Sequence, residues 1–311
     1  MTRFGLAAVC LAAACGGASA PRPSAPAPAP GVAPARAVAP LVLNSALVNG
    51  TTLAYRLVGD TGTPVVFVHG SLGDFADWDA QIATFAQTHR VLVYSRRYHP
   101  PNAPRNDDQT YSPMLHADDL AALLLQLDLA PAHIVGSSYG AYTALVLALE
   151  HPELVRSVVL GEPPIMPLLN RTPESDALRR AYFTNVLDPA RAAFAKGDSV
   201  GGLRTFLNGE GLLARPGTNL LAHAFELRRE MLANREQYMP PLACANLGAL
   251  HTGVLLVSGD RSAPVFHAIT AELARCLQND STATIPGAGH AMHTANPAFY
   301  NQVVLRYIAT H

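Results

Sequence analysis

The sequence has no excess of charge of either sign. Its 311 residues include 22 Lys and Arg and 23 Asp and Glu, which gives a formal net charge of −1 at pH 7. Proteins that bind nucleic acid or an anionic membrane surface by electrostatics carry a basic patch or a strong positive charge. The charge balance therefore argues against nucleic-acid and membrane-surface partners, and it favours a small neutral substrate.

The N-terminal apolar run is too short to cross a bilayer. Gly5–Ala14 is a ten-residue apolar stretch behind Arg3, whereas a spanning helix needs about 20 residues. A short apolar run behind a positive charge is typical of an export signal. Residues 11–17 resemble the lipobox of bacterial lipoproteins, although the favoured leucine lies one place too far upstream of the cysteine. The resemblance implies a signal peptide over residues 1–14 and lipidation of Cys15.

A second cleavage site leaves an alternative open. Ala18–Ala20 has the A-x-A pattern of an ordinary signal-peptide site, and cleavage there would give a secreted soluble protein, although Pro21 would obstruct it. We favour the lipoprotein, attached in the periplasm or at the outer membrane through its lipid anchor alone. Residues 15–40 are rich in Pro and Ala, with seven prolines between 21 and 40. That composition cannot bury a core, and it predicts a disordered tether before a domain at 41–311.

Cysteine is scarce, and none lies in a metal-binding pattern. Beyond Cys10 and Cys15, the chain has only Cys244 and Cys276. The sequence contains no C-x-x-C pair and no Cys/His spacing typical of a zinc site, so we expect no metal. No motif implies an organic cofactor. In an oxidising compartment Cys244 and Cys276 could pair. Two buried free thiols are an equally good interpretation of the sequence.

The pentapeptide Gly136–Gly140 has the pattern G-x-S-x-G in an informative context. It follows the β-branched apolar run 132–135 and precedes the apolar helical stretch 139–151. A tight turn from a strand into a helix needs small residues and presents its serine at the strand's carboxyl end, next to a helix N-terminus. Ser138 is therefore a candidate nucleophile.

Apolar strands alternate with helices along the rest of the chain. This order predicts a mostly parallel sheet with helices on both faces, opened by an antiparallel pair around Asn49-Gly50, a strong hairpin signal. We expect eight strands, at 41–48, 52–58, 65–68, 91–94, 132–135, 155–160, 253–257 and 283–285, and helices around 77–88, 113–129, 139–151, 264–276 and 297–310. The stretch 165–250 has no convincing strand and predicts an inserted helical cap over the strand ends, where ligands bind.

Three motifs in this order resemble the α/β-hydrolase fold superfamily, in particular its serine esterases and lactonases, over residues 45–311. Val68–Gly73 resembles the oxyanion-loop H-G motif, Gly136–Gly140 is the nucleophile elbow, and Ile285–His290 places a histidine in the family's G-x-G-H setting. The resemblance implies Ser138 as the nucleophile and His290 as the base. It also implies an oxyanion hole formed by the backbone N–H groups of Ser71 and Tyr139. His293 is the nearest rival base, for which we expect a surface or cap contact.

The catalytic acid departs from the commonest pattern of the family. Relatives usually read G-x-x-D after the seventh strand, but Gly259–Ser262 has serine at that place and Asp260 two places early. In some relatives the acid follows the sixth strand instead, where this chain has Glu162. We prefer Glu162 as the residue that orients His290, and we keep Asp260 as the alternative acid, because Asp260 also suits a turn-stabilising role.

Together these features predict an exported serine hydrolase that cleaves an ester or a lactone through an acyl-enzyme on Ser138. Two alternatives remain. The same residues could cleave an amide or a C–C bond, or the chain could be a non-catalytic binding lipoprotein on the same fold. The natural substrate, its binding residues and the oligomeric state are not encoded in any motif.

Overall fold

The computed structural model describes Met1 and residues 42–212, 220–233 and 242–311. The expected signal peptide at 1–14, the lipidation site Cys15 and the tether at 15–40 lie outside the described residues and stay predictions. No helix in the described part of the chain has the length and apolar character of a membrane span.

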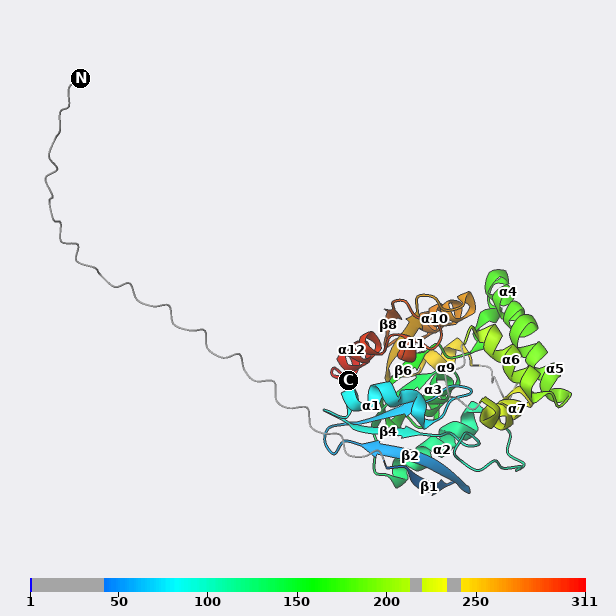
Figure 1. The fold of residues 1–311 in the computed structure, drawn as a ribbon, viewed down its shortest axis with the longest axis horizontal. Helices are drawn as coiled ribbons and strands as arrows, with labels where there is room; N and C mark the ends of the chain where they lie inside the picture. Colours follow the sequence, from blue (N-terminus) through cyan, green and yellow to red (C-terminus); the bar gives the residue numbers. More distant parts are fainter. Residues whose placement is uncertain (2–41, 213–219, 234–241) are drawn as a thin grey trace. The chain divides into compact units, whose positions relative to one another are not determined.

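One sheet of eight strands runs through the domain (Figure 1), in the order β1-β2-β4-β3-β5-β6-β7-β8. The first two neighbouring pairs are antiparallel and the other five are parallel. The strands are β1 (Asn44–Val48), β2 (Thr51–Val58), β3 (Pro64–Val68), β4 (Arg90–Tyr94), β5 (Ala132–Ser137), β6 (Val155–Gly161), β7 (Gly253–Gly259) and β8 (Asp280–Ile285). The predicted fold class, a mostly parallel eight-stranded sheet flanked by helices, is confirmed.

Strand ends differ from the prediction by a few residues. The hairpin turn at Asn49-Gly50 is present, with φ of 47° and 70°, the left-handed conformation that the sequence favours there. The largest shifts are of three residues: β1 begins at Asn44 and not at Leu41, and β8 begins at Asp280 and not at Ala283. As an edge strand β8 is largely exposed, so its first residues are polar and lack the apolar signature of a buried strand.

Alternate residues of the central strands face two apolar layers. Val65 and Phe67 pack in one layer with residues of α1 (Asp79–Phe85) and α12 (Pro297–Ile308). Val66 and Val68 pack in the other. That second layer contains α2 (Pro113–Gln126), α3 (Tyr139–Glu150) and α10 (Pro264–Cys276). Three short helices lie in the connections of this sheet: η1 (Phe75–Trp78) precedes α1, η2 (Pro152–Leu154) precedes β6, and α11 (Met292–Ala295) precedes α12.

Between β6 and β7 the described residues form helices joined by short turns and loops, and we call this segment, residues 166–248, the cap. It gathers at one side of the domain (Figure 1). Its elements are η3 (Met166–Asn170), α4 (Pro173–Tyr182), the π-helical turn η4 (Phe183–Leu187), α5 (Asp188–Ala195), α6 (Ser199–Glu210), η5 (Leu220–His223), α7 (Ala224–Leu232) and α9 (Cys244–Gly248). Its described residues contain no strand, as the sequence predicts.

A disulfide joins Cys244 to Cys276. It links the start of α9, in the cap, to the end of α10, which packs against the sheet. Of the two interpretations that the sequence allows for these cysteines, the structure contains the paired one.

Replacing both Cys244 and Cys276 with serine should destabilise the protein. The bond closes a loop with a sequence separation of 32, and removing it restores conformational entropy to the unfolded chain. We expect the free energy of unfolding to fall by about 3 to 4 kcal/mol, measured by equilibrium urea unfolding. Reductant should lower the stability of the unchanged protein to that of the double variant and leave the variant as it was. Equal stability of the oxidised and reduced protein would contradict the expectation.

Candidate active site

The turn from β5 into α3 holds Ser138 in a conformation that few residues adopt. Its φ is 53° and its ψ is −124°, a strained combination for a residue with a side chain. The N–H of Ser138 donates to the carbonyl oxygen of Gly161, at 2.7 Å. A Cβ on Gly136 would lie 2.5 Å from the Gly140 oxygen, and a Cβ on Gly140 would lie 2.2 Å from the Val68 oxygen. Both glycines are therefore needed for the turn to close.

His290 lies on the loop after β8 and faces Ser138. Its Nε2 is 2.9 Å from Oγ of Ser138, and the ring of Phe266 stacks on the imidazole with centroids 4.0 Å apart. The ring is buried. Because Nδ1 faces a carboxylate, the proton belongs on Nδ1, which leaves Nε2 to accept from the serine hydroxyl.

The partner of Nδ1 is Glu162, the first residue after β6. One carboxylate oxygen of Glu162 lies 2.7 Å from Nδ1 of His290, and the other accepts from the N–H of Gly259 at 3.0 Å. Glu162 is 0% exposed and has a φ of 48°. The carboxylate of Glu162 is thus held at both oxygens, by His290 at one and by the backbone of β7 at the other.

Asp260, the alternative acid, makes a different contact. Its carboxylate accepts from the N–H of Ala288 at 3.0 Å, and its side chain is exposed. Hydrogen bonds from the backbone of Gly287 and Ala288 hold the pKa of Asp260 below its ordinary value. The structure therefore brings Glu162 to His290 and leaves Asp260 in the turn after β7, where it bonds to the loop that carries the histidine, the turn-stabilising role that its position also allows.

The two expected oxyanion residues flank Ser138. Tyr139 is the first residue of α3, so its N–H lies at the positive end of the helix dipole. Ser71 follows Gly70, and a Cβ on Gly70 would lie 3.0 Å from Cβ of Ser138. Ser71 and Ser138 line the same cavity.

Arg96 braces the loop that carries Ser71. It is 1% exposed and donates to the carbonyl oxygens of His69 and Gly70, both at 3.0 Å. Its guanidinium lies over the ring of Tyr139, 4.9 Å from the centroid. His69 accepts on Nε2 from the N–H of Arg96, at 2.9 Å. One buried cation therefore holds both the oxyanion loop and the start of α3.

The cap reaches this loop through Glu230 of α7. Its carboxylate accepts from the hydroxyl of Ser71 at 2.6 Å and from the hydroxyl of Tyr111 at 3.0 Å. Tyr111 in turn accepts from Arg96 at 3.1 Å. Sequence analysis missed Glu230 because it lies in a helical stretch with no motif.

A second cap carboxylate, Glu210 at the end of α6, lies close to the base. One of its oxygens is 3.9 Å from Nε2 of His290, and the other accepts from the hydroxyl of Tyr182. Burial raises the pKa of Glu210, although His290 and the Tyr182 hydrogen bond oppose the rise. Glu210 was also missed, and no pattern in the sequence marks it.

The pKa of His290 is raised above 6.5. Burial acts to lower this pKa, but the hydrogen bond to Glu162 and the negative charges of Glu210 and Glu162 outweigh burial. These carboxylates favour the imidazolium that forms when a base removes a proton from serine.

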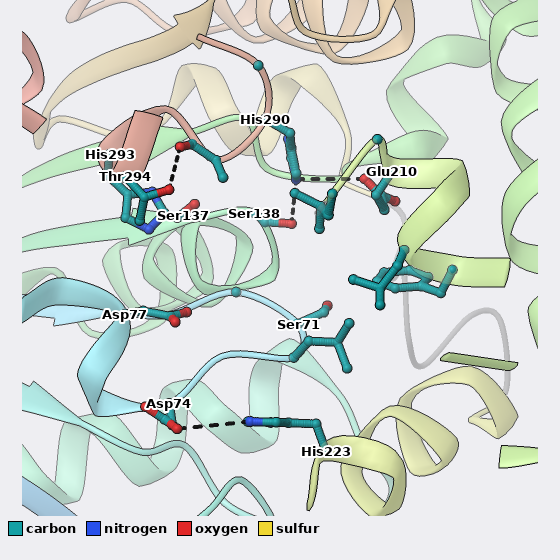
Figure 2. Close-up of a pocket in the computed structure, with 18 of the residues that line it drawn as sticks. Ser71, Asp74, Asp77, Ser137, Ser138, Glu210, His223, His290, His293 and Thr294 are labelled. Atoms are coloured by element: carbon teal, nitrogen blue, oxygen red, sulfur yellow. Dashed lines mark hydrogen bonds and ion pairs between the residues drawn. The ribbon is translucent and has the colours of Figure 1, made fainter. Parts of the chain in front are cut away.

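Ser71, Ser138, Glu210 and His290 line a cavity of about 720 Å³ between the strand ends and the cap, within the usual range for small-molecule sites. Figure 2 shows Glu210 pointing towards His290 and Ser138 from one side, with Ser71, Asp74 and His223 on the other.

His293, the rival base, has a different environment from the one we expected. It is buried, and its ring stacks on Trp78 with centroids 4.3 Å apart. The expected surface or cap contact is therefore wrong: the short helix α11 turns this ring towards the apolar layer beside α12. Nε2 of His290, and not His293, is hydrogen bonded to Ser138.

One buried group beside the cavity has the residue types of a metal site. His99, His223 and Glu226 offer ligand atoms within 4.8 Å of one another. However, Nδ1 of His99 bonds to the Gly73 oxygen at 2.8 Å and its Nε2 bonds to the Tyr111 hydroxyl at 3.0 Å. His223 bonds to Glu226 at 2.7 Å. Both nitrogens of His99, Nδ1 of His223 and one Glu226 oxygen thus already have hydrogen-bond partners, so the group fits a hydrogen-bonded polar cluster better than a cation site.

Comparisons with known proteins agree with this geometry. The chain is 32% identical over 123 residues to the uncharacterized hydrolase YraK of Bacillus subtilis, a match that spans 40% of this chain and 45% of that protein. It is 27% identical over 287 residues to the sn-1-specific diacylglycerol lipase ABHD11 of Mus musculus, which covers 83% of this chain and 85% of the lipase. A solved structure of Est816, described as an N-acyl homoserine lactone degrading enzyme, matches with a TM-score of 0.63 at 22% identity, over 85% of this chain and 100% of that one.

The family model of the alpha/beta hydrolase fold matches residues 63–296. That range begins just before β3 and contains the oxyanion loop, the elbow, the cap and the histidine loop. The chain therefore belongs to the α/β-hydrolase fold family and is a hydrolase of that fold.

Proposed function

We propose that the protein is a serine hydrolase that cleaves a carboxylic ester or lactone through an acyl-enzyme on Ser138. The observation that carries the proposal is one continuous line of hydrogen bonds: Ser138 to His290 at 2.9 Å and His290 to Glu162 at 2.7 Å. This line ends in a cavity between the sheet and the cap.

In the first step, Oγ of Ser138 attacks the substrate carbonyl carbon while Nε2 of His290 takes the hydroxyl proton. The carbonyl oxygen becomes an anion, for which the backbone N–H groups of Ser71 and Tyr139 are the expected donors. When the C–O bond breaks, His290 returns the proton to the departing oxygen and leaves an acyl group on Ser138. Glu162 keeps the imidazole in the correct tautomer and stabilises its charged form.

In the second step, water attacks the acyl carbon and His290 accepts its proton. The bond to Oγ then breaks, the proton passes to Ser138, and the acid product leaves. A lactone differs only in that its alcohol stays attached to the acid. The lipase and lactone-degrading activities of the matched proteins support an ester or lactone substrate for this chain.

Replacing Ser138 with alanine should abolish hydrolysis of a short-chain p-nitrophenyl ester. We expect kcat to fall by roughly 10⁵- to 10⁶-fold, because no nucleophile remains. The unchanged protein should react with a fluorophosphonate probe, and Ser138→Ala should not.

Ser137→Ala is the matched control for this experiment, since Ser137 lines the same cavity one residue earlier and should keep the label. An unlabelled, inactive wild-type protein that is nevertheless folded would favour the binding lipoprotein. Amide or C–C bond cleavage without ester turnover would favour the other alternative.

Glu162→Gln and Asp260→Asn form a matched pair, because each change replaces a carboxylate with an amide of the same shape. We expect Glu162→Gln to lower kcat by roughly 10⁴-fold, since an amide no longer enforces the required tautomer of His290. Asp260→Asn keeps an oxygen that can accept from Ala288, so activity should stay close to that of the unchanged protein. The reverse order of effects on kcat would make Asp260 the acid.

The pH profile should report the raised pKa of His290. Only neutral His290 can accept the serine proton, so kcat/KM should fall as the pH drops through this pKa, with the acidic limb above pH 6.5. Glu210→Gln removes a negative charge that raises this pKa and should move the limb to lower pH. Asp260→Asn should leave the limb in place. A limb that does not move in Glu210→Gln would exclude Glu210 as a cause of the raised pKa.

A further inference from the structure

The charges around the cavity are of one sign. Three carboxylates line it, from Asp74, Asp77 and Glu210, and its described lining residues include neither lysine nor arginine. Among the described lining residues, the groups that can become positive are the imidazoles of His223, His290 and His293. A cavity lined by acidic side chains concentrates cations and disfavours anions.

Within this lining, Glu210 has an oxygen without a hydrogen-bond partner among the described residues. The side chain is only 3% exposed. One oxygen accepts from Tyr182, and the other has no hydrogen-bond partner among the described residues. A buried carboxylate left in this state is costly unless a positive or donating group meets it. Asp74 differs, because it accepts from the N–H of Ala76 at 2.7 Å and lies 4.0 Å from His223.

The position of Glu210 in its helix makes the negative charge still less favourable. It is the last residue of α6, which ends at Gly211 in the left-handed conformation. The carboxyl end of a helix carries a partial negative charge, which favours cations and opposes a carboxylate. A bound cation would therefore offset both the cost of burying this charge and its unfavourable interaction with the helix dipole.

In its reactive form His290 does not supply that cation. Its Nε2 must accept the proton of Ser138, so the imidazole is neutral when it acts as the base. In that form, a cation that meets Glu210 has to come from a bound molecule. The free oxygen of Glu210 is 3.9 Å from Nε2, and Ser138 is 2.9 Å from the same atom. A group bound by Glu210 would lie within a few bonds of the scissile carbonyl.

We propose that Glu210 forms an ammonium-binding subsite, so that the preferred substrate is an ester or related acyl compound with a positively charged nitrogen close to the scissile carbonyl. This inference rests on the proposed hydrolase activity and adds the class of substrate. It departs from the neutral substrate that the overall charge balance favours, because the net charge of the chain does not describe the lining of one cavity. Glu210 binds the substrate, and Tyr182 holds its carboxylate in place.

Pairs of isosteric esters test the proposal. Alanine methyl ester and methyl isobutyrate differ by an ammonium in place of a methyl group on the acyl side. Acetylcholine and 3,3-dimethylbutyl acetate differ by a trimethylammonium group in place of a tert-butyl group on the alcohol side. For each pair, kcat/KM is measured by pH-stat titration of the released acid, and the ratio of the charged to the neutral ester is compared among wild type, Glu210→Gln and Glu174→Gln. Glu174 is an exposed glutamate in the same cap.

We expect the wild type to prefer the charged ester in at least one pair by about tenfold to hundredfold, as for a hydrogen bond to a charged group. The pair that shows this preference indicates whether the acyl side or the alcohol side of the substrate carries the nitrogen. Glu210→Gln should reduce that ratio by about tenfold or more, and Glu174→Gln should not change it. Both esters of a pair are measured at the same pH. A change in the pKa of His290 that slows both reactions by the same factor therefore cancels in the ratio of the two kcat/KM values.

Two results would overturn the subsite. In one, the wild type hydrolyses neutral and charged esters equally well. In the other, Glu210→Gln slows both members of each pair by the same factor, so that Glu210 acts on His290 alone. A folded protein that hydrolyses none of the four esters and takes no fluorophosphonate label would refute the hydrolase proposal itself, which separates the two failures.

Discussion

The parallel pairing of β5 with β6 determines where the reacting groups of this protein lie. Ser137 pairs with Gly161 at the ends of these strands, and the N–H of Ser138 donates to the Gly161 oxygen at 2.7 Å. Ser138 and Glu162 therefore leave neighbouring strands at the same level, both with positive φ. Such conformations persist only where the surrounding structure enforces them. Here the sheet does so, and β7 adds a hydrogen bond from Gly259 to Glu162.

A second constraint acts through Arg96. This buried cation joins the oxyanion loop, the ring of Tyr139 and, through Tyr111, the carboxylate of Glu230 in the cap. Removing one partner from such a network leaves a buried charge uncompensated, which is strongly unfavourable. The position of α7 and the geometry of the oxyanion loop thus depend on the same network of contacts. The cap therefore helps to hold the oxyanion loop in place as well as lining the cavity.

Local patterns predicted the sheet and the groups that follow its strands. Glu162 could be found because it stands directly after an apolar strand next to the nucleophile strand, and Ser138 because small residues on both sides mark a tight turn. Glu210 and Glu230 could not be found in this way. Their roles depend on how α6 and α7 fold back over the strand ends, which is decided by packing between segments far apart in the chain. The paired state of Cys244 and Cys276 has the same origin, since it depends on α9 lying beside the end of α10.

The proposed ammonium subsite and the raised pKa of His290 are linked through one carboxylate. The charge of Glu210 stabilises the protonated form of His290 and so contributes to the raised pKa of the base. A bound ammonium neutralises that charge, and the pKa of His290 falls towards the value that Glu162 alone would set. By thermodynamic reciprocity, the affinity of Glu210 for the cation is higher when His290 is neutral than when His290 is protonated. Substrate binding would then release the base at the moment when Ser138 has a carbonyl to attack, whereas a neutral ester would find His290 still partly protonated.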